Sequence, residues 1–286
     1  MRGPEAQVGR TGSAGLLVVC PTPIGNLDDI TLRVLAALQR ADVVACEDTR
    51  RTRGLLERHG IAARLVSLHE HNERARAREL SARIAHGETV ALVSDAGMPL
   101  ISDPGFELLR ACLAAGLAVE VLPGASAVLT ALVASGLPAE RFCFVGFLPR
   151  TRAQRAALLA RALETLVAFE SPHRLLSTLE LIAEADPRRA TVVCRELTKL
   201  HEEVRRGGAA ELAEHYRAHP ARGEVVLVCA PAARGRGDEA DRERVLEALR
   251  TLVAAGARPR AAAGALARLT GLAANELYRQ LTSGEQ

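Results

Sequence analysis

Short apolar segments that suit β-strands alternate with longer segments that suit α-helices along residues 15–122. The expected strands are Leu16–Cys20, Val43–Cys46, Leu65–Leu68, Thr89–Val93 and Val119–Leu122, and the expected helices are Ile30–Arg40, Thr52–His59, Glu73–His86 and Phe106–Ala115. Strands that alternate with helices in this way form a mostly parallel sheet covered by helices. We therefore predict an N-terminal α/β domain over residues 15–122.

The same alternation continues over residues 123–230. The expected strands are Phe142–Val145, Leu166–Phe169, Thr191–Cys194, Glu202–Arg205 and Val225–Ala230, and the expected helices are Ala125–Gly136, Arg152–Leu163, Pro172–Ala185 and Ala209–Ala218. A chain of 286 residues is long enough for two such domains. The predicted fold class is therefore α/β with two domains, divided near Leu122–Gly124.

The two ends of the chain have a different character. Residues 1–14 are polar and rich in glycine without an apolar segment, so we expect a disordered leader and no signal peptide. Residues 231–238 have the composition of a linker. Residues 239–286 carry helical patterns at Glu239–Ala255, Arg260–Thr270 and Ala273–Leu281, and the last two form a helix-turn-helix pattern. This module suits nucleic-acid binding or a capping or dimerisation role, and the pattern does not decide between them.

Composition indicates the cellular compartment and the kinds of partner more than it indicates the activity. The net charge of +3 permits a nucleic-acid partner without requiring one. Lys199 is the only lysine, so every other basic residue is an arginine; codon bias explains such an excess, although arginine also suits phosphate recognition. The six cysteines lack CxxC spacing, which argues against a zinc site and a disulfide framework and favours a reduced, cytoplasmic protein. No apolar run approaches the roughly 18 residues of a membrane span.

Several common motifs are absent. No GxGxxG follows the first strand, and the chain contains no GxxxxGK[ST] and no HExxH. The usual dinucleotide or class I methyltransferase fingerprint, P-loop nucleotide hydrolysis and zinc-peptidase chemistry are therefore not expected. His69-Glu70-His71 superficially resembles a metal-binding sequence, but neighbouring side chains in an extended segment point to opposite sides. We expect no metal site.

Polar loops rich in glycine and proline follow the ends of the expected strands. They cover residues 20–27, 47–51, 69–73, 94–105 and 170–174. The carboxyl ends of parallel strands meet at one edge of a sheet, where ligands bind in open α/β folds. Two domains with such edges predict a cleft between them. Structural interpretations also exist: a rigid first loop, a helix N-cap with exposed salt bridges within Glu47–Arg51, and helix N-caps at Asn72 and Ser171.

Six segments taken together resemble one family, in the same order along the chain. They are Pro21–Thr31, Glu47–Arg50, His69–Glu73, Ser94–Gly105, Pro123–Ser126 and Glu170–Arg174. They are similar to the ribosomal RNA small subunit methyltransferase I family, within the tetrapyrrole-methylase-like (class III) methyltransferases, and the resemblance covers about Gly15–Ala230. It implies S-adenosylmethionine (SAM) held in the cleft, 2′-O-methylation of a cytidine in the decoding region of 16S rRNA, a small-ribosomal-subunit partner and a homodimer.

The resemblance also implies which residues line the SAM pocket. They are Pro23, Asp95, Ala96, Gly97, Met98, Pro99, Pro123, Gly124 and Ser126. Asp95 and Ser126 are the expected polar contacts, and Arg222-Gly223-Glu224 is expected to approach the adenine. Asp103 is instead expected to cap the following helix, with Pro104 in its first position.

The reaction needs a group that takes a proton from the ribose hydroxyl. Candidates for this base are Glu47, His69 and Glu70, with Asn26 and Asn72 as orienting groups, and Asp95 suits either a base or a SAM contact. The sequence does not choose among them. Candidate RNA-phosphate contacts are Arg50, Arg51, Arg74 and Arg174, although such arginines can also simply solvate helices.

Two other functions remain possible at this stage. One is a methylase of a tetrapyrrole or another small molecule on the same fold, and the other is a non-catalytic ribosome-assembly binder. The segment His69–Glu73 and the C-terminal helices argue against a small substrate. The complete set of cleft loops argues against a protein that only binds.

Overall fold

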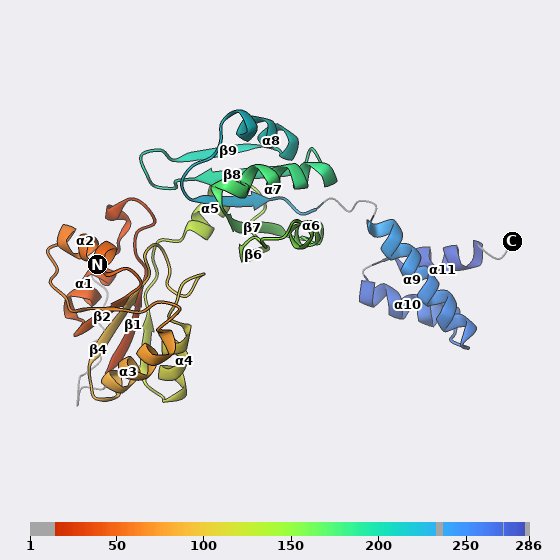
Figure 1. The fold of residues 1–286 in the computed structure, drawn as a ribbon. Helices are drawn as coiled ribbons and strands as arrows, with labels where there is room; N and C mark the ends of the chain where they lie inside the picture. Colours follow the sequence, from red (N-terminus) through yellow and green to blue (C-terminus); the bar gives the residue numbers. More distant parts are fainter. Residues whose placement is uncertain (1–14, 233–236, 271, 284–286) are drawn as a thin grey trace, which may run out of the picture. The chain divides into compact units, whose positions relative to one another are not determined.

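The computed structural model describes residues 15–232, 237–270 and 272–283 (Figure 1). The leader expected over residues 1–14 lies outside the described residues, as do residues 233–236 of the linker expected over 231–238. The chain divides between Pro231 and Ala232 into two compact units. The first unit contains both sheets, and the second contains only helices.

The first sheet has the order β3-β2-β4-β1-β5, and every pair of neighbours is parallel. Its strands are β1 (Leu16–Cys20), β2 (Val43–Cys46), β3 (Leu65–Ser67), β4 (Thr89–Val93) and β5 (Ala118–Val121). Its helices are the 3-10 turn η1 (Leu27–Asp29), α1 (Leu32–Arg40), α2 (Thr49–Arg58), α3 (Glu73–Ala85) and α4 (Phe106–Ala114). The predicted parallel sheet is confirmed here.

Helices cover both faces of this sheet, so its inner strands are apolar throughout. Successive strand residues point to opposite faces. Leu17 and Val19 pack in the core that α3 and α4 share, whereas Val18 and Cys20 pack in the core that α1 and α2 share. Burial on both faces holds the strand ends, and the loops that follow them, in fixed positions.

The second sheet has the order β6-β7-β10-β8-β9. Its strands are β6 (Phe142–Phe147), β7 (Thr165–Glu170), β8 (Ala190–Arg195), β9 (Glu203–Gly208) and β10 (Val225–Cys229). Its helices are α5 (Ala127–Ser135), α6 (Arg152–Ala160), α7 (Pro172–Ala185) and α8 (Ala209–Ala218). Helices α6, α7 and α8 pack on one face, and α5 packs on the other together with Ile24 from the first domain.

Strand direction in the second sheet differs from the expectation of a parallel arrangement. Only β6 and β7 pair in parallel, while β7–β10, β10–β8 and β8–β9 are antiparallel. A parallel pair needs a long crossover, usually a helix, whereas a short connection gives an antiparallel pair. Residues 196–202 join β8 to β9 without a helix, so these two strands pair as a hairpin. The loops of this domain therefore do not all share one edge.

The second unit contains α9 (Gly237–Ala254), α10 (Pro259–Thr270) and α11 (Ala274–Ser283). These elements lie close to the helices expected from the sequence. This unit has a small core of its own, which is formed by Leu249, Ala262, Ala263 and Leu277. The Arg260 guanidinium lies 5.2 Å from the ring centre of Tyr278. Within the described parts of both units, no helix combines the length and apolar character that crossing a membrane requires.

Candidate functional site

A cavity of about 430 Å³ lies in the first unit, with walls from both α/β domains. The first domain contributes Ile24, Ala96, Gly97, Met98, Ile101, Ser102 and Asp103. The second domain contributes Ser126, Ala127, Val128, Phe147, Phe169, Glu170, Ser171, Pro172, Cys194, Leu197, Gly223, Glu224, Val225 and Val226. Its size and its mostly apolar walls with a few polar groups are typical of small-molecule sites. The predicted cleft between the domains is confirmed.

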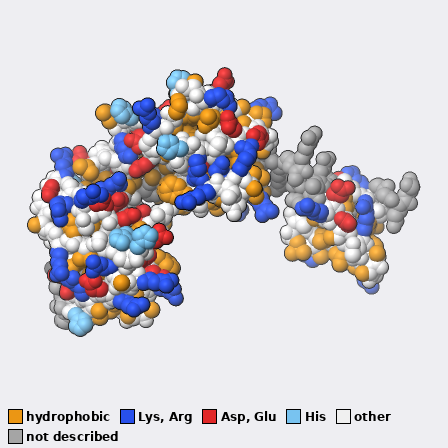
Figure 2. All heavy atoms as spheres, in the orientation of Figure 1, with side chains coloured by type: hydrophobic (Ala, Val, Ile, Leu, Met, Phe, Trp, Pro, Cys, Tyr) orange, Lys and Arg blue, Asp and Glu red, His pale blue; other side chains and the backbone are white. Residues whose placement is uncertain are grey.

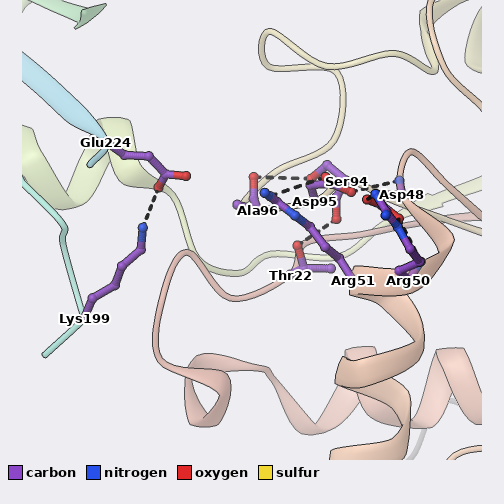
Figure 3. A network of polar contacts seen from close by, with 9 residues as sticks. All are labelled: Thr22, Asp48, Arg50, Arg51, Ser94, Asp95, Ala96, Lys199 and Glu224. Carbon is purple, nitrogen blue, oxygen red and sulfur yellow. Dashed lines mark hydrogen bonds and ion pairs between the residues drawn. The ribbon is translucent and has the colours of Figure 1, made fainter. Parts of the chain in front are cut away.

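The loop after β1 fixes the loop after β4 against this cavity. The backbone N–H of Thr22 donates to the carbonyl of Gly97, and the N–H of Gly97 donates back, each at 2.9 Å. The Thr22 hydroxyl also donates to the carbonyl of Ser94 at 3.0 Å (Figure 3). Gly97 has φ +78°, and a Cβ there would lie 3.3 Å from the side chain of Ile24. Glycine is therefore required where the main chain forms the cavity wall.

The residues expected to hold the cofactor divide into two groups. Ala96, Gly97, Met98 and Ser126 line the cavity. Pro23, Asp95, Pro99, Pro123 and Gly124 stand in the same loops but are not part of the lining. Gly124 packs against the Pro21 ring, where a Cβ would lie 2.7 Å from its nearest atom, so this group supports the loops. Ser126 caps α5, accepting from the N–H of Leu129.

Asp95 points toward the start of α2. Its Oδ1 accepts a hydrogen bond from the backbone N–H of Asp48 at 3.0 Å, and its Oδ2 lies 3.4 Å from a guanidinium nitrogen of Arg51 (Figure 3). Asp48 itself is the N-cap of α2, within the segment for which a helix N-cap was one interpretation. Asp95 thus connects the loop after β4 to the helix after β2.

Asp103 lines the cavity, and its expected role as a helix cap is wrong. Helix α4 begins at Phe106 after Gly105, which has φ +123°. The N–H groups of Gly105 and Glu107 are instead capped by Oε1 of Glu73, at 2.7 and 3.0 Å. A carboxylate at the start of α3, more than 30 residues earlier in the chain, thus does the capping, which leaves Asp103 facing the cavity.

The environment of Asp103 disfavours its ionised form. Burial raises the pKa of this carboxyl from 3.8 to about 6, and the negative charges of Glu47 and Asp95 add to the shift, whereas a hydrogen bond with the Ser94 side chain opposes it. Burial, followed by the charge of Asp95, also raises the pKa of Glu47. A carboxyl with a pKa near 6 in a ligand cavity is suited to proton transfer.

The candidate proton acceptors other than Asp95, and the candidate orienting groups, lie outside the cavity lining. Asn26, Glu47, His69, Glu70 and Asn72 are all described, and none of these five is among the residues that line it. Glu47 interacts electrostatically with both Asp103 and His69. Glu47 therefore acts on Asp103 through its charge and does not itself line the cavity.

Asn72, a candidate orienting group, contacts His69. Its Oδ1 accepts from the His69 backbone N–H at 2.9 Å, and its amide nitrogen lies 3.1 Å from Nε2 of the ring. Asn72 occupies the N-cap position of α3 but makes no side-chain capping bond. Glu70 lines a second hollow together with Asn72 and Arg74, apart from the main cavity.

Glu170 organises the second domain's contribution. It is buried, its Oε2 accepts from the Thr178 hydroxyl at 2.7 Å, and its Oε1 lies 2.6 Å from the guanidinium of Arg174. Arg174 also donates to the carbonyls of Leu148 and Pro149 at 3.2 Å. The structure therefore brings Glu170 to the cavity, and the guanidinium of Arg174, a candidate RNA-phosphate contact, is engaged within the fold. Ser171 sits at the N-cap of α7 without a side-chain capping bond.

Two other arginines expected to contact RNA, Arg50 and Arg51, also have protein partners. Arg50 forms a two-point contact with Asp48 at 2.8 and 3.1 Å, and these hydrogen bonds lower the pKa of Asp48 to about 2. Arg50 and Arg51 nevertheless keep most of their side-chain surface exposed. Figure 2 shows basic and acidic side chains interspersed over the visible face of the first unit.

The sequence reasoning missed the segment between β8 and β9, residues 196–202. Glu196 and Thr198 have φ of +51° and +64°, which is unusual for residues other than glycine. The Lys199 ammonium lies 2.9 Å from Glu196 and 3.0 Å from Glu224, a cavity residue (Figure 3). Burial alone would lower the pKa of Lys199, but the two carboxylates raise it. The one available signal was that Lys199 is the chain's only lysine.

Comparisons with known proteins agree with this architecture. Residues 16–213 match the family model of the tetrapyrrole (corrin/porphyrin) methylases. The ribosomal RNA small subunit methyltransferase I of Escherichia coli O157:H7 is 46% identical over 276 residues, which cover 93% of this chain and 94% of that protein. The uroporphyrin-III-C-methyltransferase of Thermus thermophilus is 25% identical, with a TM-score of 0.56 over 75% of this chain and 94% of that chain. A structure of the Thermus enzyme complexed with S-adenosylhomocysteine, at 22% identity, has a TM-score of 0.54 over 77% of this chain and 99% of that chain.

The shared architecture and the near full-length identity lead to one assignment. The chain belongs to the ribosomal RNA small subunit methyltransferase I family, within the tetrapyrrole methylases.

Proposed function

We propose that this chain transfers the methyl group of SAM to the 2′-hydroxyl of a cytidine ribose in the decoding region of 16S rRNA. As a member of its family, it is a methyltransferase that uses SAM as the methyl donor. The observation that carries the proposal is the cavity, which both α/β domains build from the loops that show the resemblance. We expect such an enzyme to act in the cytoplasm.

The residues present fit SAM. Ile24, Val128 and Leu197 supply apolar wall for an adenine. Gly97, where a Cβ would crowd Ile24, exposes main-chain groups for polar contacts. The carboxylates of Asp103 and Glu224 suit a positively charged ligand. Ala96–Met98, Ser126 and Gly223–Glu224 would hold the cofactor, which supplies an electrophilic methyl group when bound.

We assign the proton acceptor to Asp103. It is the carboxyl on the first domain's side of the cavity, and with a pKa of about 6 it is ionised at neutral pH yet basic enough to accept a proton. Asp103 would take the hydroxyl proton as the ribose oxygen accepts the methyl group, while the cofactor sulfur would leave with the electron pair of its bond to that carbon as S-adenosylhomocysteine. Glu47 acts through Asp103, because its negative charge makes that carboxylate more basic. Positioning of the hydroxyl supplies further acceleration.

The recognition of RNA is assigned to exposed arginines and to the helical unit. Arg50 and Arg51 extend from the first turn of α2, whose N-cap is held by Asp95 next to the cavity loop. Their contacts with Asp48 and Asp95 can be exchanged for phosphate contacts, since exposed ion pairs contribute little. A homodimer is also proposed, because β5 is an edge strand and Val121, Leu129 and Val133 expose apolar side chains.

One assay tests this function. The protein is incubated with tritiated SAM and either small ribosomal subunits or free 16S rRNA, and the label is mapped by alkaline hydrolysis, which a 2′-O-methyl group blocks. Label on the ribose of a cytidine supports the proposal. Label on a base, or none in RNA, contradicts it. A tetrapyrrole acceptor in a parallel reaction tests the alternative of a small-molecule methylase.

A further inference from the structure

Phe147 is an exposed aromatic residue at the cavity, in a chain with very few aromatics. The sequence has five phenylalanines, two tyrosines and no tryptophan. The Phe147 side chain lines the cavity while 61% of its surface remains exposed. Its ring lies 5.4 Å from that of Phe169, which also lines the cavity. Large exposed apolar groups at a concave site typically mark contact with a ligand.

An irregularity in β6 determines where Phe147 points. The pairing of β6 with β7 shifts register between Phe144 and Phe147, and Gly146 has φ +64°. Such bulges redirect side chains and are frequent next to active sites. Without this bulge, the strict alternation of side chains along the strand would place Phe147 on the face of the sheet opposite to Phe144. The backbone is thus shaped to turn this ring toward the cavity.

A loop from the other domain faces the bulge. Ser102 Oγ lies 3.6 Å from the position that a Cβ on Gly146 would occupy, so the two segments are adjacent. Ile101, the preceding residue, lines the cavity with 43% of its surface exposed. Leu100 and Ser102 on either side of Ile101 have φ of +72° and +69°. Strained backbone of this kind is retained mainly at functional positions.

We propose that Phe147 and Ile101 form the two sides of a slot that receives the unstacked base of the target nucleotide. The inference rests on the proposed function, because a ribose in reach of Asp103 carries its base with it. Asp103 is two residues beyond Ile101 in the same loop. The slot and the proton acceptor therefore belong to one nucleoside subsite, which spans the two domains.

The chemistry of RNA favours this occupant. An enzyme that reacts with a nucleotide inside folded RNA draws it out of the stack, and an aromatic side chain replaces part of the lost stacking. A pyrimidine ring has two flat faces, and each is stabilised by apolar surface. The phenylalanine ring of Phe147 covers one face, and the branched aliphatic chain of Ile101 covers the other. The adenine of SAM is the competing occupant, and the experiment separates the two.

The test compares Phe147→Ala with Phe106→Ala in the full-length protein. Phe106 is a matched control, because 60% of its surface is exposed and it does not line the cavity. The measurements are methyl transfer from tritiated SAM to small ribosomal subunits, and SAM affinity by calorimetry. We expect Phe147→Ala to lower kcat/KM for the subunits by on the order of 10-fold or more. SAM affinity and the activity of Phe106→Ala should stay near wild type.

Two further variants guard against a folding artefact. Phe147→Tyr keeps an aromatic ring and should retain most of the wild-type activity. Ile101→Ala removes the opposite side of the slot and should also lower kcat/KM. An equal loss of SAM affinity in Phe147→Ala would assign the ring to the cofactor and overturn the proposal. Equal activity of Phe147→Ala and Phe106→Ala would also overturn it. Label on a base in the wild type would refute ribose methylation, while the ratio of the two variants' rates would still report on the slot.

Discussion

The backbone N–H of Asn26 donates a hydrogen bond to the hydroxyl of Thr198 at 2.9 Å, and this contact joins the two α/β domains. Asn26 belongs to the loop after β1, and Thr198 belongs to the loop after β8. Ile24 and Leu197, which are neighbours of these residues in the chain, line the cavity. The relative position of the cavity walls therefore depends on this contact.

Gly25→Ala tests that dependence. A Cβ at Gly25 would lie 2.5 Å from Cγ of Lys199, 2.7 Å from Oγ1 of Thr198 and 2.8 Å from the carbonyl of Leu197. Because the last two atoms are held by the loop, the domains must shift, and overpacking of this kind costs about 1–3 kcal/mol. We expect SAM affinity, measured by calorimetry, to fall by about 5-fold or more. Gly54→Ala is the control, since nothing lies within 4 Å of the added atom, and its affinity should be unchanged.

Lys199→Arg tests whether the chain's only lysine is needed as an ammonium. The Lys199 stem lies against Gly25, and its compact head group fits between Glu196 and Glu224. A planar guanidinium does not reproduce that geometry. We expect SAM affinity to fall by on the order of tenfold, which corresponds to the loss of one hydrogen bond to a charged group. The control is Arg217→Lys, at the exposed pair with Glu180, which should leave SAM affinity unchanged. Wild-type SAM affinity in Lys199→Arg would refute the requirement for an ammonium at this position.

The fold was predictable where the pattern is local. The strands Leu16–Cys20, Val43–Cys46 and Thr89–Val93 and the helix Pro172–Ala185 have the predicted bounds, because burial on both faces leaves an uninterrupted apolar run and Pro172 marks a helix start. Strand direction in the second sheet was not predictable from the alternation alone. It depends on the short connection between β8 and β9, whose pairing is a tertiary property.

The sequence predicted which loops form the site better than it predicted which side chains face the cavity. The loop after β4 reaches the cavity as expected, but the direction of Asp103 depends on Glu73, a residue from another helix that caps α4 in its place. Phe147 depends on a bulge, and bulges leave only a glycine as their trace in a sequence. Contacts between segments distant in the sequence decided both outcomes.

Asp103→Asn should remove the proton acceptor while keeping the shape of the side chain. We expect kcat to fall by about 10²- to 10⁴-fold, the usual contribution of a general base. In the wild type, kcat should rise with pH up to about 6 and then level off as Asp103 ionises. The variant should lose this limb of the pH profile. Glu120→Gln on β5, at an exposed pair with Arg33, should keep the wild-type profile.

The same substitution should stabilise the protein at neutral pH. Asp103 binds its proton more tightly in the folded chain, because its pKa is raised from 3.8 to about 6, so its contribution to stability is lost as the pH rises through that window. Asparagine has no charge to bury. Allowing for solvent screening, we expect Asp103→Asn to be more stable by about 1–2 kcal/mol at pH 8 and nearly equal at pH 4. Urea unfolding at the two pH values measures this, and a difference of the same size at pH 4 would contradict the assignment.

Asp95→Ala should weaken SAM binding through the loop that Asp95 holds. The substitution removes the acceptor for the Asp48 N–H and the partner of Arg51, and so loosens the segment that contains Ala96 and Gly97. Asp95→Asn keeps one acceptor oxygen and should retain more affinity than alanine. Calorimetry with SAM measures both variants. Unchanged affinity in Asp95→Ala would show that the loop after β4 keeps its position without this contact.

Removal of residues 232–286 should separate RNA recognition from cofactor binding. The helical unit has its own core around Leu249 and Leu277, while the cavity is lined only by residues of the first unit. We therefore expect the shortened protein to keep its SAM affinity and its melting temperature but to methylate small ribosomal subunits with a raised KM. Since phosphate contacts weaken as salt rises, the full-length protein should lose more affinity than the shortened one, and the difference in KM between them should shrink as the salt concentration rises. An equal loss of SAM affinity would instead mean that the helical unit supports the fold of the cavity.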